Sequence, residues 1–168
     1  MSFDHILKAI FSALFLANIL RISTPLILPA LGGLVTDLAG ATNIALEGIM
    51  LVAAFTGVVV SAYTKSVTAG ILCGILSGVL ISALLAYFYL YLKTDVFLAG
   101  IAINIMATGG TIFLLYILTG DKGNSSKLAS GMAPIVHIPL IKDIPFLGTV
   151  LSGHNIFTYA AFLLTWLV

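Results

Sequence analysis

Two long stretches without a charged residue dominate the pattern of this chain. They are residues 66–92 and 96–118, and the only charged residues between positions 66 and 118 are Lys93 and Asp95. An apolar helix of about 20 residues matches the roughly 30 Å hydrocarbon core of a bilayer. A helix on the surface of a soluble domain would need a polar face, which neither stretch has. The pattern therefore predicts a transmembrane hairpin with a short charged turn.

Two further hydrophobic segments precede this hairpin. Segment 43–64 contains Glu47 near its start and ends before Lys65. Segment 6–35 is interrupted by residues that disturb a helix, namely Arg21, Pro25, Pro29 and the glycine pair 32–33. Proline removes a backbone donor and clashes one turn back, and a broken helix is tolerated in lipid only where protein or a cavity covers it. Segment 6–35 is therefore predicted to be broken, with a discontinuous helix.

The last part of the chain has a different character. Residues 119–155 are rich in glycine and proline but partly apolar, which favours a loop that folds back onto the membrane surface. A final hydrophobic segment, 156–168, would reach only about 20 Å as a helix, less than a bilayer core requires. The sequence thus predicts one transmembrane domain over 1–168, an all-α polytopic helical bundle that is the N-terminal portion of a longer protein.

The composition supports a membrane location. The 168 residues are 61% hydrophobic and 8% charged, whereas soluble domains carry about 25% charged residues. The formal net charge of +1 provides no basic surface for nucleic acid. We therefore expect a multi-pass protein of the cell membrane, surrounded by lipid and without a nucleic-acid partner.

Small residues recur at intervals of four in segment 66–92. They are Gly70, Gly74, Gly78 and Ser82, and this spacing places them on one helical face. Small residues on one face let two membrane helices approach closely. We therefore expect this face to pack against a neighbouring helix.

Four polar residues within the hydrophobic segments are candidates for a solute path. Glu47 is costly in a membrane, by roughly 2.5–3.5 kcal/mol on insertion scales, and such residues normally face the bundle interior or a wet cavity. Asn43 lies four residues earlier, so the two side chains would share a helical face. Alternatively, Asn43 caps the helix and Glu47 occupies its first turn. Asn104, with Thr108 one turn later, either joins helices or lines a pore.

No pattern in the sequence indicates catalysis. His137 and His154 lie seventeen residues apart, without cysteine or acidic residues at metal-ligand spacing, so we expect them in solvent or at the interface. No nucleophile elbow, zinc-binding histidine pair or phosphate-binding loop is present. We expect no catalytic residue, no metal site and no cofactor in this chain.

Several segments resemble a known family of membrane proteins. They are 24–33 (TPLILPALGG), 39–50 (AGATNIALEGIM), 94–104 (TDVFLAGIAIN) and 143–148 (DIPFLG). The chain closely resembles the permease subunits of bacterial ABC importers for nucleosides and simple sugars, within the broader ribose and branched-chain amino acid permease family. The segment with Asn43, Glu47 and Gly48 is the most specific of these.

The resemblance implies a function and a set of partners. It implies a permease subunit that forms part of the path for a nucleoside or simple sugar. A second permease subunit, cytoplasmic ATPase subunits that bind the ATP, and an extracytoplasmic solute-binding lipoprotein would complete the transporter. Family members are nearly twice as long as this chain, in agreement with the expectation of a longer protein.

Two other functions fit the residues alone. A secondary transporter or channel would use Glu47 as a protonation or ion site. A membrane scaffold without transport activity would use only the Gly70–Gly78 face to bind a partner helix.

Overall fold

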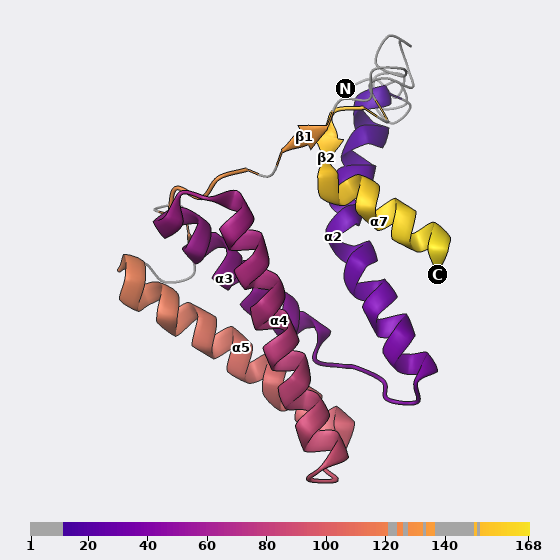
Figure 1. Ribbon diagram of the computed structural model, residues 1–168, viewed down its shortest axis with the longest axis vertical. Coiled ribbons are helices and arrows are strands. Elements are labelled where there is room, and N and C mark those ends of the chain that lie inside the picture. Colours follow the sequence, from indigo (N-terminus) through magenta and orange to yellow (C-terminus); the bar gives the residue numbers. More distant parts are fainter. Residues whose placement is uncertain (1–11, 121–123, 126–127, 133, 137–149, 151) are drawn as a thin grey trace, which may run out of the picture. The chain divides into compact units, whose positions relative to one another are not determined.

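The computed structural model describes residues 12–120, 124–125, 128–132, 134–136, 150 and 152–168 (Figure 1). The chain forms two compact units, of which one comprises Met1–Gly32 with Ala133–Val168 and the other comprises Gly33–Met132. We call them the terminal unit and the central unit, and each is described by itself.

Three long helices make up most of the central unit. They are α3 (Leu46–Thr64), α4 (Val67–Leu90) and α5 (Val96–Thr119), and they lie side by side (Figure 1). Their bounds fall within three residues of the predicted segments 43–64, 66–92 and 96–118. These helices and α2 are long and apolar enough to cross a membrane. The predicted all-α, polytopic membrane fold is confirmed.

Polar side chains at the turns fix where α4 and α5 begin. Ser66 is the N-cap of α4 and accepts a hydrogen bond from the Ala69 N–H, and Asp95 is the N-cap of α5 and accepts from Phe97 and Leu98. Such caps satisfy backbone donors that have no partner within the helix. The charged turn of the predicted hairpin is therefore also the start signal of its second helix.

The small-residue face of α4 lies against α3, most tightly at its N-terminal end. A Cβ added at Gly70 would lie 2.6 Å from the Gly57 carbonyl oxygen, and one at Gly74 would lie 3.0 Å from that of Ala53. At Gly78 an added Cβ would meet only side chains, at 3.6 Å and beyond. Because two backbones approach this closely, only glycine fits at the first position without a shift of the helices.

Ser82, the last residue of that pattern, uses its hydroxyl within α4. It donates to the Gly78 carbonyl oxygen at 2.9 Å. The core of the central unit lies nearby, where α3 begins, and consists of Ala45, Leu85, Ala99 and Ile103, with Ile49, Ile81 and Phe88 packed against them.

The predicted break in segment 6–35 is wrong for the described residues. α2 (Ala13–Leu38) is one continuous helix with Pro25 and Pro29 inside it. Each proline removes only one ladder hydrogen bond, and neighbouring helices and Ser/Thr side chains make this loss tolerable in membrane helices. The Thr24 hydroxyl donates to the Leu20 carbonyl at 2.9 Å, beside the Arg21 carbonyl that Pro25 leaves without its usual donor.

The terminal unit combines the first part of α2 with α7 (Ile156–Leu167) and a short strand pair. β1 (Ile135–Val136) pairs antiparallel with β2 (His154–Asn155), which leads directly into α7 (Figure 1). α7 crosses α2, and the Thr24 and Thr158 hydroxyl oxygens lie 3.2 Å apart. Both threonines are buried.

The predicted loop 119–155 belongs partly to each unit. Within the central unit, the Gly131 N–H donates to the Ser61 hydroxyl at 3.3 Å, so this part of the loop lies near the end of α3. Whether the loop lies on the membrane surface remains a prediction. The expectation of a solvated or interfacial His154 is wrong for this chain, because the side chain is buried and its Nε2 lies 2.7 Å from the Val150 carbonyl oxygen. His137 lies outside the described residues.

We predict that Gly70→Ala destabilises the protein more than Gly78→Ala does. The same methyl group clashes with backbone at position 70 and meets ordinary contacts at position 78. Overpacking of this kind typically costs about 1–3 kcal/mol. Thermal unfolding of both variants in the same detergent measures the difference, and equal transition temperatures would contradict the close packing of α3 and α4.

Candidate functional site

The side chain of Asn104 holds the start of α3 against α5. Its Oδ1 accepts a hydrogen bond from the Gly48 N–H at 2.7 Å, and its Nδ2 donates to the Ile44 carbonyl at 2.9 Å. Gly48 is the third residue of α3, so its N–H is one of the donors that the helix itself cannot satisfy. The Asn104 carboxamide on α5 is thus hydrogen-bonded both to the Gly48 N–H inside α3 and to the Ile44 carbonyl oxygen just before α3.

This contact lies within the length of α5 and not at its end. Asn104 is eight residues beyond Val96, the first residue of α5, which corresponds to about 12 Å along the helix axis. The backbone before α3 reaches the same surface, because a Cβ added at Gly100 would lie 3.2 Å from the Ala45 nitrogen. α3 therefore begins beside the body of a helix that is long enough to cross a membrane.

Asn43 lies in the turn before α3. Its Oδ1 accepts a hydrogen bond from the Ala45 N–H at 2.9 Å. The predicted N-cap role is wrong, because Ala45 occupies the N-cap position and α3 begins at Leu46. Asn43 is therefore outside the helix, and the expected helical face shared with Glu47 does not exist.

Glu47 occupies the first turn of α3, as the capping interpretation predicted. A carboxylate at this position lies close to the positive end of the helix dipole, which is favourable. Its side chain is exposed on this chain, and its orientation toward the bundle interior or a wet cavity stays a prediction. Among the described residues, Glu47 forms no hydrogen bond or ion pair with another residue.

Thr108 does not join this group. Its side chain is exposed, and its hydroxyl donates to the Asn104 carbonyl oxygen in the same helix at 2.8 Å. The structure therefore gathers Asn43, Glu47 and Asn104 at the start of α3, a set that we call the α3-start cluster. Thr108 lies one turn further along α5.

Gly48 is the member of this site that sequence reasoning missed. A Cβ at this position would lie 2.8 Å from Asn104 Oδ1, so the amide can reach the backbone only because no side chain is present. The glycine directly after Glu47 was the available signal, since an isolated glycine inside a helical pattern often marks a close approach.

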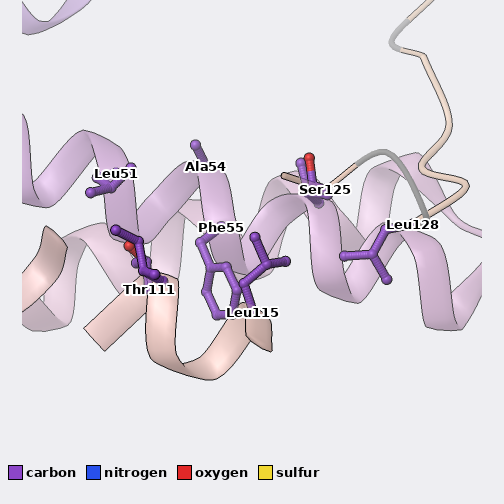
Figure 2. Close-up of a pocket in the computed structure, with 9 residues that line it drawn as sticks. Leu51, Ala54, Phe55, Thr111, Leu115, Ser125 and Leu128 are labelled. Carbon is purple, nitrogen blue, oxygen red and sulfur yellow. The ribbon is translucent and has the colours of Figure 1, made fainter. Parts of the chain in front are cut away.

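A separate cavity of about 230 Å³ lies between α3 and α5 (Figure 2). Its lining is mostly apolar and consists of Leu51, Ala54, Phe55, Val58, Thr111, Ile112, Leu115, Ser125 and Leu128. Figure 2 shows the Phe55 ring beside Leu115. The Thr111 hydroxyl already donates to the Ala107 carbonyl at 2.7 Å. The cavity offers few polar groups to a sugar or nucleoside.

Within the described residues, no group of three or more His, Cys, Asp or Glu side chains could hold an ion. The α3-start cluster combines two amides and one carboxylate, which is suited to hydrogen bonding with a polar solute or with backbone groups.

Comparison with known proteins shows the family to which the chain belongs. The family described as the branched-chain amino acid transport system permease component matches residues 15–168. The chain belongs to this family. The described residues contain four helices that are long and apolar enough to cross a membrane, so the chain is a multi-pass membrane protein.

Three characterised or named relatives cover most of the chain. The guanosine ABC transporter permease protein NupQ of Bacillus subtilis is 30% identical over 142 residues, or 81% of this chain and 44% of the relative. The nucleoside ABC transporter permease protein NupC of Lactococcus lactis is 33% identical over 164 residues, or 92% and 51%. TsgC13 of Haloferax volcanii, named as a candidate glucose ABC transporter permease protein, is 31% identical over 144 residues, or 83% and 43%.

The chain spans about half the length of these relatives. No solved structure matches it at a significant level.

We predict that Asn104→Leu and Asn104→Asp both lower the thermal stability of the protein. Leucine leaves both the Gly48 N–H and the Ile44 carbonyl without a partner, at roughly 1–3 kcal/mol for each unsatisfied group. Aspartate keeps an acceptor for the Gly48 N–H, but its carboxylate faces the Ile44 carbonyl oxygen and adds a charge that is costly in a membrane helix.

Thr108→Val is the matched control for these variants. Its hydroxyl contacts only its own helix, so its transition temperature should stay close to that of the native protein. A native-like transition temperature for Asn104→Leu would contradict the role of the amide at the start of α3.

Proposed function

We propose that this chain forms part of the membrane-spanning permease of an ABC importer for a nucleoside or a simple sugar. The observation that carries the proposal is the similarity to two nucleoside permeases over 81% and 92% of the chain. The relative named for glucose transport supports keeping sugars in the substrate class.

The α3-start cluster is the part of the chain that we assign to the solute path. Asn43 and Glu47 present polar groups where α3 begins beside α5. Asn104 would act there by positioning α3, because both ends of its amide are engaged by the backbone. Thr108 remains a second, more distant candidate for the path.

The proposal includes partners that would supply energy and solute. A second permease subunit would complete the membrane part, cytoplasmic ATPase subunits would bind and hydrolyse ATP, and an extracytoplasmic lipoprotein would deliver the solute. This chain would hold no cofactor of its own.

Uptake of radiolabelled solutes tests the proposal. Cells that carry the complete transporter should accumulate guanosine, uridine, ribose or glucose, and accumulation should be lost when the gene for this chain is deleted. Accumulation should also be lost when the ATP site of the partner ATPase is inactivated. Unchanged uptake of every solute in the deletion strain would contradict the proposal.

The same assay addresses a secondary transporter that uses Glu47. The observation in favour of this alternative is a carboxylate in an apolar helix with no partner among the described residues. Uptake that stops with a protonophore at constant ATP, and that continues after the ATPase is inactivated, would favour it over the ABC importer.

We predict that Glu47→Gln lowers uptake more than Glu47→Asp does, because only the second variant keeps the charge near the α3 dipole. The initial rate of uptake at equal expression measures both effects. Thr165→Val is a suitable control, since the Thr165 hydroxyl donates to the Ala161 carbonyl oxygen within its own helix, α7. Native rates for both Glu47 variants would limit this residue to a role at the helix terminus.

A further inference from the structure

The prolines and glycines of α2 have no role in the α3-start cluster. Pro25, Pro29, Gly32 and Gly33 all lie within α2, and the two compact units divide between Gly32 and Gly33. α2 is therefore a continuous helix that belongs to both units, and its stretch with two prolines and Gly32 precedes the point of division.

We propose that residues 25–32 form a hinge in α2, about which the terminal unit and the central unit turn as separate bodies. The use of this motion in a transport cycle rests on the proposed function. The bending itself does not, and it can be measured without a transported solute.

The hydrogen bonds that the prolines remove lie on one side of the helix. Pro25 cannot donate to the Arg21 carbonyl, and Pro29 cannot donate to that of Pro25. Residues four apart share a helical face, so both losses weaken the same side of α2. A sharp bend in a helix almost always has such a cause, and proline is the commonest.

Gly32 makes the same stretch more flexible without serving the packing of the described chain. A Cβ added there would meet nothing within 4 Å, so close approach of another described segment does not explain this glycine. Glycine inside a helix lowers its stability relative to alanine, because it gains backbone freedom when unfolded. Its place directly before the division between the units suits a hinge.

The helix is anchored on each side of this stretch within a different unit. On the N-terminal side, the buried Thr24 hydroxyl lies 3.2 Å from that of Thr158 in α7, within the terminal unit. On the C-terminal side, a Cβ added at Gly33 would lie 3.0 Å from the Leu46 side chain in α3, within the central unit.

The end of α2 has a further attachment in the central unit. The Thr42 hydroxyl donates to Asp37 Oδ1 at 2.7 Å, which joins the last turn of α2 to the turn before α3. The eight residues between Thr24 and Gly33, about 12 Å of helix, form no side-chain hydrogen bond to another described segment. Hinges in proteins are formed by short stretches of this kind between better-packed bodies.

Distances between spin labels test the hinge in the complete permease in lipid nanodiscs. With Cys73→Ser as background, labels at Leu163→Cys in α7 and Leu80→Cys in α4 report on the two units. Labels at Leu80→Cys and Ile105→Cys report within the central unit, and all three positions are exposed. We expect a wide or two-peaked distance distribution for the first pair and a single narrow one for the second.

The deciding variant combines Pro25→Ala, Pro29→Ala and Gly32→Ala. It restores the two missing backbone hydrogen bonds of α2 and stiffens the helix. We expect the distribution between the units to narrow to the width of the control pair, and uptake to fall in parallel. Gly109→Ala is the matched control, because it is another helical glycine whose added Cβ meets nothing within 4 Å. Gly109→Ala should change neither the width of the distance distribution between the units nor the rate of uptake.

The outcomes separate the hinge from the proposed function. A narrow distribution between the units in the native protein, or one that the combined variant leaves wide, would overturn the hinge. If the combined variant does not assemble, Gly32→Ala alone decides by the same criterion, since it adds one methyl group without a neighbour. Absence of uptake by the native transporter would contradict the proposed function while the distances still decide the hinge.

Discussion

The bonds between the Asn104 amide and the backbone at the start of α3 are the interaction on which the site depends. In lipid, a helix terminus cannot rely on water to satisfy its free N–H and carbonyl groups. Asn104 supplies one acceptor to Gly48 and one donor to Ile44. It thereby allows α3 to begin about 12 Å along α5, with Asn43 and Glu47 at the same place. A polar cluster can exist there because protein groups form the hydrogen bonds that the backbone at the start of α3 needs.

Glycines make the close packing around α3 possible on both of its sides. Gly48 and Gly100 let α5 approach the start of α3, whereas Gly70 and Gly74 let α4 approach its later turns. Most large apolar side chains of these helices point outward and are exposed on this chain. This is the reverse of a soluble protein, in which large side chains fill the core, and it is expected where lipid and not water surrounds the helices.

The sequence predicted the helices well and the polar contacts only in part. Long apolar stretches define α4 and α5 with little ambiguity, because membrane thickness sets the length of a spanning helix. The caps Ser66 and Asp95 were local signals that the sequence analysis did not use. The partners of Asn104 are 56 and 60 residues away in the chain, so no local pattern reveals them. The break in segment 6–35 was predicted from its prolines and glycines, but the lost backbone hydrogen bonds are tolerated in a continuous membrane helix. Glu47 was placed correctly in the first turn, but its orientation depends on tertiary contacts.

The chain belongs to a permease family, and both features have a role in the proposed importer. The hydrogen-bonded start of α3 would lie beside the solute path, and the proposed hinge in α2 would let the two units move. The central claim is that Asn104 holds α3 in lipid. Solid-state NMR of the complete permease in bilayers measures this directly, through the dipolar coupling between the Asn104 side-chain carbonyl carbon and the Gly48 amide nitrogen. A measurable through-space coupling, as expected when Asn104 Oδ1 lies 2.7 Å from the Gly48 nitrogen, is the predicted result. No detectable coupling, together with rapid deuterium exchange at the Gly48 amide, would contradict the account.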